Sequence, residues 1–467
     1  SAASLLQTRV IIGGTSIADA NTIIGYGGQS VAATTIGYGV YVNSVANEYT
    51  SYNNLSATSV FSPVNHVHVT ASAGNIVTSN NTITFVTGAA STGAQNGVNV
   101  SAFSATLTNT SRVDSNLVQN VTLGGTSVFF GINYSLLGLT GSAYYCRNNR
   151  VENITRTGTG GNITGIFFSS TSVAAGSVPS DKQMVNNSVK NITASANTAA
   201  FIFNGLQWVG TSGLMKGNTI DNINIGNTAT TVSTVNLINS NCNLATGLVV
   251  PQNVDSNIVK TVNLTGPAFA AYGIILINGS PVNNTFSRNI ITALSIIGGG
   301  TVGRLEGIFD SVNTGTALLN INNNIISNFS ASAANTDNAV KGINVISGDA
   351  TKNLIYNNTI YLGGGSTITS TGTNFGVSGV CFSVGVTIKN NIINIAATPN
   401  GTGRVAAIRS LLAGTANVIS ANFGSNSSNN ILFALNATNS FLYAESAIGV
   451  APVVFYNLTN DPNFNTS

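Results

Sequence analysis

This sequence of 467 residues is poor in charge. Lysine and arginine total 16 and aspartate and glutamate 13, so charged residues make up 6% of the chain. An ordinary soluble domain carries about 25%. With so few basic residues, no patch that could neutralise nucleic-acid phosphates is expected. The hydrophobic content of 43% is high enough to build a core, which excludes a charged disordered chain.

Other absences narrow the class further. The sequence contains no apolar run of about 18 residues, so no membrane-spanning helix is expected. Its 50 glycines follow no period of three, which excludes collagen. Leu, Glu, Lys and Gln are scarce, whereas Val, Ile, Thr, Asn and Gly dominate, and this favours strands over helices. Residues 1–20 carry no signal-peptide pattern, and the start at Ser1 indicates a processed or truncated chain.

A short phrase recurs along the chain: an asparagine, any residue, and then an aliphatic residue. The interval between copies varies from 31 to 39 residues, with a mean of about 35. The anchoring asparagines are Asn81, Asn116, Asn149, Asn187, Asn218, Asn257, Asn289, Asn324, Asn358, Asn391 and Asn430. Asn21 and Asn54 extend the series less securely. All eleven residues two places after the anchors are aliphatic, from Ile83 to Leu432. A second phrase, a small residue followed by an apolar one, comes later in each repeat, as in Gly131-Ile132.

This repeat predicts an all-β fold, a single right-handed parallel β-helix of about 11–13 coils. A unit of about 35 residues without a helical pattern cannot bury its own apolar face, so it must stack on its neighbours. Equivalent positions then lie about 4.8 Å apart in columns. We expect the anchors to form a structural Asn ladder at a corner, where asparagine tolerates left-handed backbone and its amide bonds the neighbouring coils.

The position three places after the anchor predicts a charge ladder. It holds Glu152, Lys190, Asp221 and Lys260 on consecutive coils. Alternating charges at one offset indicate outward pairs, each contributing about 0–1 kcal/mol in water. The same repeat predicts the domain organisation. Residues 1–75 form an irregular N-terminal cap or docking segment that is partly β-helical, 76–435 the β-helix, and 436–467 a C-terminal cap or connection.

The stretch from Gly342 to Asn430 carries a family resemblance. It reads G-I-N-V-I-S-G-D-A-T-K-N-L-I-Y-N-N-T-I-Y-L, then N-F-G-V-S-G-V, K-N-N-I-I-N, T-P-N-G-T-G-R and S-N-N-I-L-F. This resembles the large secreted right-handed β-helix proteins of Bacteroidota, strongly over residues 300–435 and along the repeat back to about residue 80. The resemblance implies export by the type IX secretion system and display on the cell surface or release. The family's C-terminal sorting domain is missing, which implies one segment of a longer protein.

Catalysis on this scaffold needs clustered acids, because glycoside hydrolysis uses two carboxylates about 5–10 Å apart. The nearest pair is Glu306 and Asp310, with Arg304 nearby. Four residues apart on a strand, the two acids lie about 13 Å apart. We interpret them as the solvated edge of one strand, and the chain is expected not to be an enzyme.

Histidine and cysteine are also scarce. His66 and His68 project from one strand face, a weak two-ligand metal site without nearby acids or cysteines. An exposed polar face beside buried Val67 and Val69 is the favoured interpretation, so no metal site and no cofactor are predicted. Cys146, Cys242 and Cys381 fall on distant coils, and we expect three free, buried thiols.

Two further observations leave alternatives open. Aromatic pairs such as Phe129-Phe130 and Phe167-Phe168 offer a sugar-binding platform, but alternate residues of a strand point inward, so half of each pair is expected in the core. Trp208 has no counterpart in other repeats, and both a loop anchor and a ligand contact are consistent with it. The residues one place after the anchors form no threonine ladder, which disfavours ice binding.

The sequence therefore predicts a structural or adhesive segment of a secreted or cell-surface bacterial protein, with a subunit of a fibre or surface appendage as one form of this role. Its expected partners are other copies of itself, adjoining domains of a larger surface protein, or cell-surface glycans, with no nucleic acid and no membrane span. The expected location is extracellular or on the outer cell surface. The alternative is a β-helix that binds or cleaves polysaccharide.

Overall fold

The computed structural model describes the chain except residues 1–8, 27–35, 44, 46, 61–63, 73, 104–109, 139–140, 173–180, 243–250, 279–282, 299–302, 312–316, 332–336, 338, 349–350, 364–366, 370–374, 401–402, 413–422, 425, 435–438, 447–453 and 457–467. The chain divides into two compact units. Unit 1 comprises residues 1–223 and 241–250, and unit 2 comprises residues 224–240 and 251–467. Each unit is described by itself.

Unit 1 is built from three parallel sheets. The first sheet holds β1 (Val10–Gly13), β4 (Glu48–Ser51), β7 (Ile76–Ser79), β10 (Thr110–Asp114), β13 (Ala143–Arg147), β16 (Asp181–Val185) and β19 (Leu214–Lys216). The second holds β2 (Asn21–Ile24), β5 (Asn53–Val60), β8 (Thr82–Thr87), β11 (Leu117–Leu123), β14 (Arg150–Arg156), β17 (Ser188–Asn197) and β20 (Thr219–Asn227). The third holds β3 (Gly37–Asn43), β6 (Val64–Ser72), β9 (Gln95–Phe103), β12 (Phe129–Gly138), β15 (Ile163–Ser172) and β18 (Ile202–Gly210). A short 3-10 helix, η1, spans Ile17–Asp19.

Unit 2 repeats this plan. Its first sheet holds β22 (Gln252–Asp255), β25 (Asn283–Ser287), β28 (Leu318–Asn322), β31 (Asn353–Tyr356) and β35 (Thr387–Lys389). The second holds β23 (Ile258–Thr265), β26 (Ile290–Ile297), β29 (Ile325–Ala331), β32 (Thr359–Leu362), β36 (Ile392–Ile395) and β39 (Ile431–Ala434). The third holds β21 (Ser233–Asn241), β24 (Phe269–Asn278), β27 (Arg304–Asp310), β30 (Val340–Val345), β34 (Phe375–Phe382), β38 (Arg404–Ser410), β40 (Ser440–Glu445) and the antiparallel β41 (Val454–Tyr456). A small extra sheet pairs β33 (Thr367–Thr369) with β37 (Thr398–Asn400).

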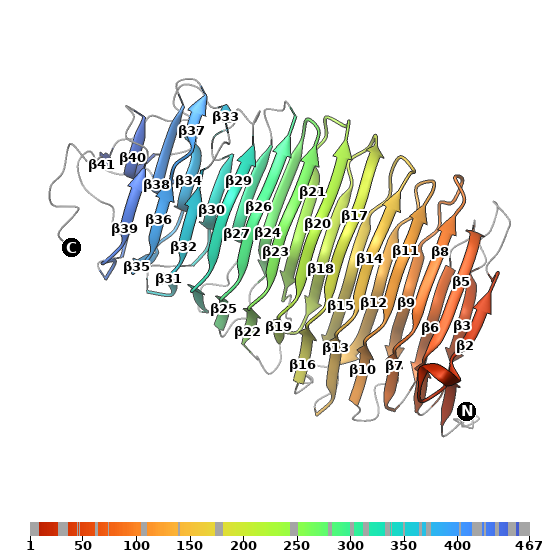
Figure 1. The fold of residues 1–467 in the computed structure, drawn as a ribbon. Helices are drawn as coiled ribbons and strands as arrows, with labels where there is room; N and C mark the ends of the chain where they lie inside the picture. Colours follow the sequence, from red (N-terminus) through yellow and green to blue (C-terminus); the bar gives the residue numbers. More distant parts are fainter. Residues whose placement is uncertain are drawn as a thin grey trace. The chain divides into compact units, whose positions relative to one another are not determined.

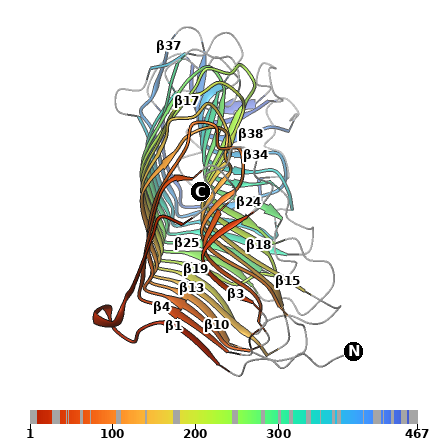
Figure 2. The ribbon, with the colours of Figure 1, turned by 90° about the vertical axis from the view of Figure 1, so that its right-hand side faces the viewer.

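The predicted fold class, a parallel β-helix, is confirmed. From β1 to β32 the strands of each sheet follow one another at intervals of three along the chain, so one coil contributes one strand to each sheet (Figure 1). The interval becomes four where the extra strands β33 and β37 are inserted, as from β30 to β34. Figure 2 shows β1, β4, β10 and β13 following one another in one sheet, with β3 and β15 in another. The core follows from the register, since Val118 lies opposite Val151 and Val151 opposite Val189, all fully buried. Such columns remove apolar surface from water along the whole unit.

The second sequence phrase marks a place where strands approach closely. A Cβ atom at Gly131 would lie 2.6 Å from the carbonyl oxygen of Gly165 and 2.6 Å from a methyl group of Val151. Both distances are below van der Waals contact, so only glycine fits at residue 131. The neighbouring Ile132 is a fully buried core residue, which explains the pairing of a small residue with an apolar one.

Coil length varies while strand register is kept. Ladder partners on adjacent coils are separated by as few as 28 residues, between Asn53 and Asn81, and by as many as 39, between Asn391 and Asn430. The strands β1 to β6 already pair within the three sheets of unit 1. The predicted division at residues 75 and 435 stays a prediction, and residues 457–467 of the predicted C-terminal cap lie outside the described residues.

Candidate functional site

A groove of about 670 Å³ lies on the outer face of the third sheet of unit 1. It crosses β9, β12, β15 and β18. Twelve side chains line it: Asn99, Ser101, Val128, Phe130, Asn133, Ser135, Asn162, Thr164, Phe167, Ile202, Asn204 and Gln207. Amides, hydroxyls and two aromatic rings predominate, and this described lining contains no charged side chain. Its chemistry suits an uncharged ligand with many hydroxyl groups.

Strand alternation places the two aromatic rings in the groove. Phe129 and Phe168 are fully buried in the core, whereas their neighbours Phe130 and Phe167 point outward and are half-buried. The ring centroids of Phe130 and Phe167 lie 6.0 Å apart in an edge-to-face arrangement. The expectation that half of each aromatic pair is core is confirmed for these two pairs. The other half forms a small aromatic platform in the groove.

Two buried asparagines beside this platform have acceptors in need of a donor. The Nδ2 groups of Asn96 and Asn99 both donate to Oδ1 of Asn65, at 2.8 and 3.1 Å. Their own Oδ1 atoms are buried and find no hydrogen-bond donor among the described residues. A buried acceptor without a donor costs about 1–3 kcal/mol. The arrangement is therefore suited to a ligand that donates hydrogen bonds.

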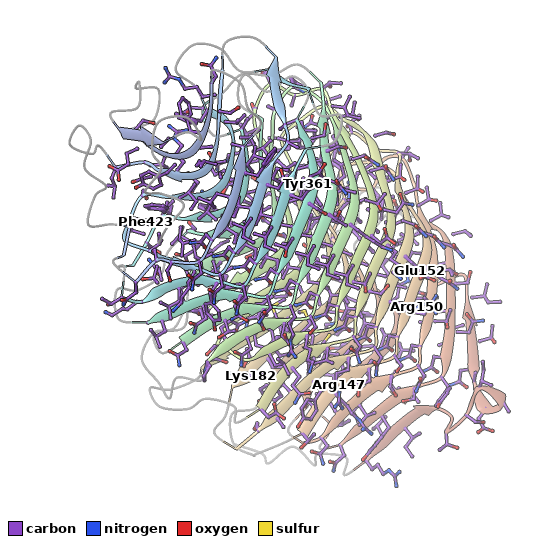
Figure 3. The ribbon with its side chains drawn as sticks, turned by 60° about the vertical axis from the view of Figure 1, so that its left-hand side comes forward. Arg147, Arg150, Glu152, Lys182, Tyr361 and Phe423 are labelled. Atoms are coloured by element: carbon purple, nitrogen blue, oxygen red, sulfur yellow. The ribbon has the colours of Figure 1, made fainter. Side chains whose placement is uncertain are left out.

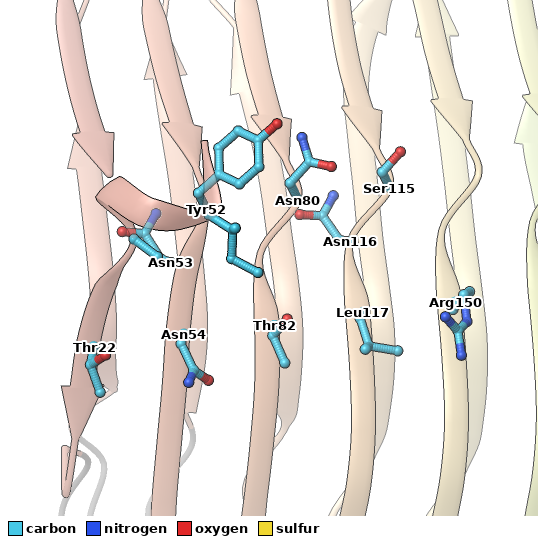
Figure 4. A pocket seen from close by; sticks show the side chains of 12 residues that line it. Thr22, Tyr52, Asn53, Asn54, Asn80, Thr82, Ser115, Asn116, Leu117 and Arg150 are labelled. Carbon is cyan, nitrogen blue, oxygen red and sulfur yellow. The ribbon is translucent and has the colours of Figure 1, made fainter. Parts of the chain in front are cut away.

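A second depression, of about 570 Å³, lies at the corner between the first and second sheets of unit 1 (Figure 4). Tyr52, Leu117 and Arg150 are among its lining residues. Its asparagines Asn53 and Asn116 already make hydrogen bonds within the fold. Arg150 lies beside Glu152 on the outer side of β14, 2.6 Å from its carboxylate (Figure 3). Asn53, Asn116 and Arg150 are thus engaged, unlike the acceptors of the groove.

The predicted anchor asparagines lie in one buried column within each unit. Nδ2 and the backbone N–H of Asn81 both donate to Oδ1 of Asn116, at 2.9 and 3.1 Å. The remaining Nδ2 hydrogen donates to the carbonyl of Thr50, so the amide is fully used. The Nδ2–Oδ1 bond recurs from Asn116 to Asn149, Asn187 and Asn218, and in unit 2 from Asn257 through Asn289, Asn324, Asn358 and Asn391 to Asn430.

Two details of the ladder prediction were wrong. The residue that continues the column beyond Asn81 is Asn53, which donates to Asn81 and accepts from Asn21, whereas Asn54 lies exposed. The left-handed backbone falls on the residue before each anchor, such as Asn80 with φ 54°. No anchor is among the described residues with positive φ.

A second asparagine row, which the sequence analysis missed, runs along the outside of unit 1. Asn120, Asn153, Asn191 and Asn222 are exposed and left-handed, with φ between 53° and 58°. Each Nδ2 donates to Oδ1 of the preceding member, at 2.9–3.2 Å. The signal was the recurrent asparagine four places after the anchor.

Only part of the predicted charge ladder is visible within one unit. Glu152 lies directly opposite Lys190 in the pairing of β14 with β17. The contact that Glu152 makes is with Arg150 on its own strand. Asp221 is half-buried on β20 and Lys260 is exposed on β23. The ladder as a continuous row stays a prediction.

The interpretation of His66 and His68 as an exposed polar face was wrong, because both are buried. His66 stacks on Phe85 with ring centroids 3.9 Å apart, and a hydrogen bond joins its Nδ1 to the hydroxyl of Tyr26. Burial lowers the pKa of His66 to about 3. His66 occupies the position that Gly97 takes one coil later, so its ring enters the core instead of solvent.

Glu306 and Asp310 are not a solvated edge either, since both are buried. Glu306 accepts hydrogen bonds from Nζ of Lys341 at 2.7 Å and Nδ2 of Asn344 at 2.9 Å. Asp310 occupies a core column opposite Val345, and burial raises its pKa to about 7. The two acids lie in different environments because Gly307 stands between them in β27. At this glycine, the alternation of inward-facing and outward-facing side chains along the strand is shifted.

The three cysteines are buried, and none is in a disulfide within the described part of the chain, as predicted. Burial raises the pKa of Cys146 well above its usual value and that of Cys381 to about 11. Of the two interpretations of Trp208, the structure favours the loop anchor, because the side chain bonds Thr211 in the connection between β18 and β19. Trp208 is fully buried, and its Nε1 donates to the carbonyl of Thr211 at 2.7 Å. Among the described residues, no three His, Cys, Asp or Glu side chains gather as metal ligands.

Comparisons with known proteins add little. No protein-family model matches the chain, and no curated protein matches it. A tailspike protein mutant of E. coli bacteriophage HK620, solved in complex with a pentasaccharide, aligns with a TM-score of 0.27 and 11% identity over 94% of this chain and 74% of the tailspike chain. A double mutant of that tailspike gives a TM-score of 0.23 and 12% identity over the same shares. Similarity at this level supports no functional inference. The described residues include no helix long and apolar enough to cross a membrane.

Proposed function

We propose that this chain is a non-catalytic, adhesive β-helix that binds neutral glycans in the groove on the outer face of the third sheet of unit 1. One observation carries the proposal: the Oδ1 atoms of Asn96 and Asn99 are buried without a donor among the described residues. Asn96 lies opposite the outward ring of Phe130, and Asn99 lines the groove together with Phe130 and Phe167. Carbohydrate hydroxyls are the donors that such acceptors require, because each hydroxyl both donates and accepts.

The rest of the groove fits the same ligand. A sugar ring has an apolar C–H face and a polar rim, so it can pack on an aromatic ring while its hydroxyls reach amides nearby. Phe130 and Phe167 supply the rings, and Asn133 and Gln207 are half-buried amides at its floor. An acidic polysaccharide would find no lysine or arginine among the described lining residues, which supports a neutral ligand.

The proposal is binding without cleavage because no carboxylate is among the described lining residues, and glycoside hydrolysis needs two. A role in adhesion follows from a binding face built on a stacked repeat. Location outside the cell and association with further copies belong to the same proposal. The proposed location outside the cell fits a weakly charged binding surface of this kind, because its polysaccharide ligand would be found there.

The test is a binding screen of the purified chain against neutral and acidic polysaccharides, by affinity electrophoresis and calorimetry. Binding to at least one neutral polysaccharide and to no acidic one is expected. Phe167→Ala is expected to weaken that binding about tenfold or more, as the loss of a central aromatic contact does. The matched control is Tyr361→Ala, which removes an aromatic ring 36% exposed on β32, in unit 2 (Figure 3).

The outcomes separate clearly. Selective loss in Phe167→Ala, with unchanged thermal stability, supports the groove as the site. Equal affinity in wild type and Phe167→Ala, or binding to acidic polysaccharides alone, overturns the proposal. Release of shortened products from any bound polysaccharide would replace binding with cleavage as the function.

A further inference from the structure

The groove is the part from β9 to β18 of a longer surface defined by strand register. Three outward columns cross six strands of the third sheet of unit 1, from β3 to β18, and we call them together the outer track. The first column is Tyr38, Asn65, Asn96, Phe130, Thr164 and Asn204; the second is Tyr41, His68, Asn99, Asn133, Phe167 and Gln207; the third is Asn43, Thr70, Ser101, Ser135, Ser169 and Val209. None of these described residues is acidic, lysine or arginine.

A second aromatic platform lies at the β3 end of the outer track. The rings of Tyr38 and Tyr41 stack with centroids 4.5 Å apart and an interplanar angle of 28°. Tyr41 also stacks on His68, with centroids 5.4 Å apart at 22°. Tyr41 remains 48% exposed despite these two contacts. A large exposed aromatic ring held rigidly by its neighbours is a preformed contact surface.

Unsatisfied acceptors connect the two platforms. Nδ1 of His68 is buried and has no hydrogen-bond partner in the described structure. The same is true of Oδ1 of Asn96 and Oδ1 of Asn99 on the next coil. Burial also lowers the pKa of His68, which keeps its ring neutral and able to accept a hydrogen bond at one nitrogen. From Tyr41 to Phe167 the second column takes four coil steps, or about 19 Å.

The same columns of unit 2 have a different character. At the equivalent positions, Lys341 and Glu306 form a buried ion pair with 7% and 0% of their side chains exposed. Tyr272 and Phe309 belong to a buried cluster. The feature that distinguishes unit 1 is therefore an uncharged surface with open aromatic rings at two places.

We infer that the outer track binds an unbranched neutral polysaccharide along the columns, across the strands, with sugar rings on both aromatic platforms and hydroxyls donating to Asn96, Asn99 and His68. This inference rests on the proposed function, and adds the length and direction of the ligand. A ligand that spans both platforms gains a second contact at high effective concentration, so its affinity should exceed that of a short one by more than the added contact area suggests.

The test uses unbranched oligosaccharide series from disaccharide to octasaccharide, based on glucose, mannose and galactose, with wild type, Tyr41→Ala and Phe167→Ala. In wild type, the affinity for the oligosaccharide is expected to increase in one step as the ligand is lengthened. The shortest oligosaccharide that reaches both platforms should bind about tenfold or more tightly than the longest one that reaches a single platform. Tyr41→Ala should remove this rise and leave short ligands unaffected. Phe167→Ala should weaken all lengths. Thermal unfolding of each variant checks that unit 1 stays folded.

Two results overturn the inference while leaving the proposed function intact. One is an affinity that does not change beyond the shortest bound ligand. The other is an unchanged rise with length in Tyr41→Ala, which would place the far end of the ligand elsewhere. Absence of binding by every series and every neutral polysaccharide overturns the inference and the proposed function together.

Discussion

Arg409 and Asp337 form a bidentate ion pair between residues 72 positions apart in the sequence. Nη1 of Arg409 donates to Oδ1 at 2.7 Å, and Nη2 donates to Oδ2 at 2.9 Å. The exposed fractions of the two side chains are 0% and 5%. The guanidinium also lies 4.2 Å from the ring centroid of Phe375, whose backbone N–H donates to Asp337. The segment that carries Asp337 is thereby tied to the outer face of β38 and β34.

Removing one partner of this pair should be costly. Asp337→Ala leaves the Arg409 charge buried without its carboxylate, for which a loss of about 3–5 kcal/mol in the free energy of unfolding is expected. Urea denaturation measures it. The control is Glu152→Gln, which removes the partner of an arginine that is 55% exposed and should cost less than about 1 kcal/mol. Similar small losses in both variants would show that the buried pair is not a structural tie.

The two asparagine rows should differ in their sensitivity to substitution. Asn149→Ala removes a buried amide. Its Oδ1 accepts hydrogen bonds from the backbone N–H and from Nδ2 of Asn116, and its Nδ2 donates to Oδ1 of Asn187. Leaving such groups without partners should cost at least about 3 kcal/mol. Asn153→Gly, in the exposed row, removes two surface bonds at φ 58°, where glycine is well accommodated. Because both bonds are exposed to water, the change in stability should be less than about 0.5 kcal/mol. Thermal and urea unfolding of both variants checks the difference, and equal effects would contradict it.

The ladder and the core columns could be predicted from the sequence because each coil repeats the same local requirement. Asn149 and Asn187 bond each other at the same offset on adjacent coils, so one alignment of the repeats reveals the whole column. Val151 and Val189 are predictable for the same reason. A structural requirement that recurs in every coil produces a periodic pattern in the sequence. The β-helix consists of such recurring requirements, so its fold could be predicted.

The burial of outward columns could not be predicted in this way. Phe167 of unit 1 and Glu306 of unit 2 both point outward from a third sheet, yet the first lines a groove and the second is fully buried in an ion pair. The difference depends on what packs over each strand, and this is not periodic. Arg409 and Asp337 illustrate the point, since their pairing joins parts of the chain with unrelated offsets.

His66 should make unit 1 sensitive to acid. Its pKa is lowered from 6.5 to about 3 by burial, so the folded chain resists protonation while the unfolded chain accepts the proton. Stability should therefore fall as the pH drops below 6.5 and continue to fall towards pH 3. His66→Leu should abolish this part of the pH dependence, measured as the difference in urea midpoint between variant and wild type from pH 7 to pH 4. The pKa of Glu48 is raised to about 7, so its contribution to the pH dependence of stability has the opposite sign. The effect of His66 is therefore isolated by the difference in urea midpoint between the variant and wild type. Parallel pH curves for the two proteins would contradict the prediction.

Asp310 should give unit 2 the opposite response. Burial raises its pKa from 3.8 to about 7, so the folded chain keeps a proton that the unfolded chain has lost. Its contribution should thus destabilise the fold progressively as the pH rises from 3.8 to 7. Asp310→Val places an apolar side chain in the column of Leu276 and Val345, and should raise the melting temperature at pH 7 while flattening its pH dependence.

Ser347 provides the matched variant for Asp310. Its hydroxyl donates to Oδ2 of Asp310 at 2.8 Å, and this hydrogen bond opposes the effect of burial on the pKa of the carboxyl. Ser347→Ala should therefore raise the pKa of Asp310 further and extend the loss of stability above pH 7, the reverse of the flattening in Asp310→Val. Melting temperatures from pH 4 to pH 9 measure both slopes. If the two variants shift the slope in the same direction, the pH response of unit 2 originates at another group, because a single buried carboxyl requires opposite shifts.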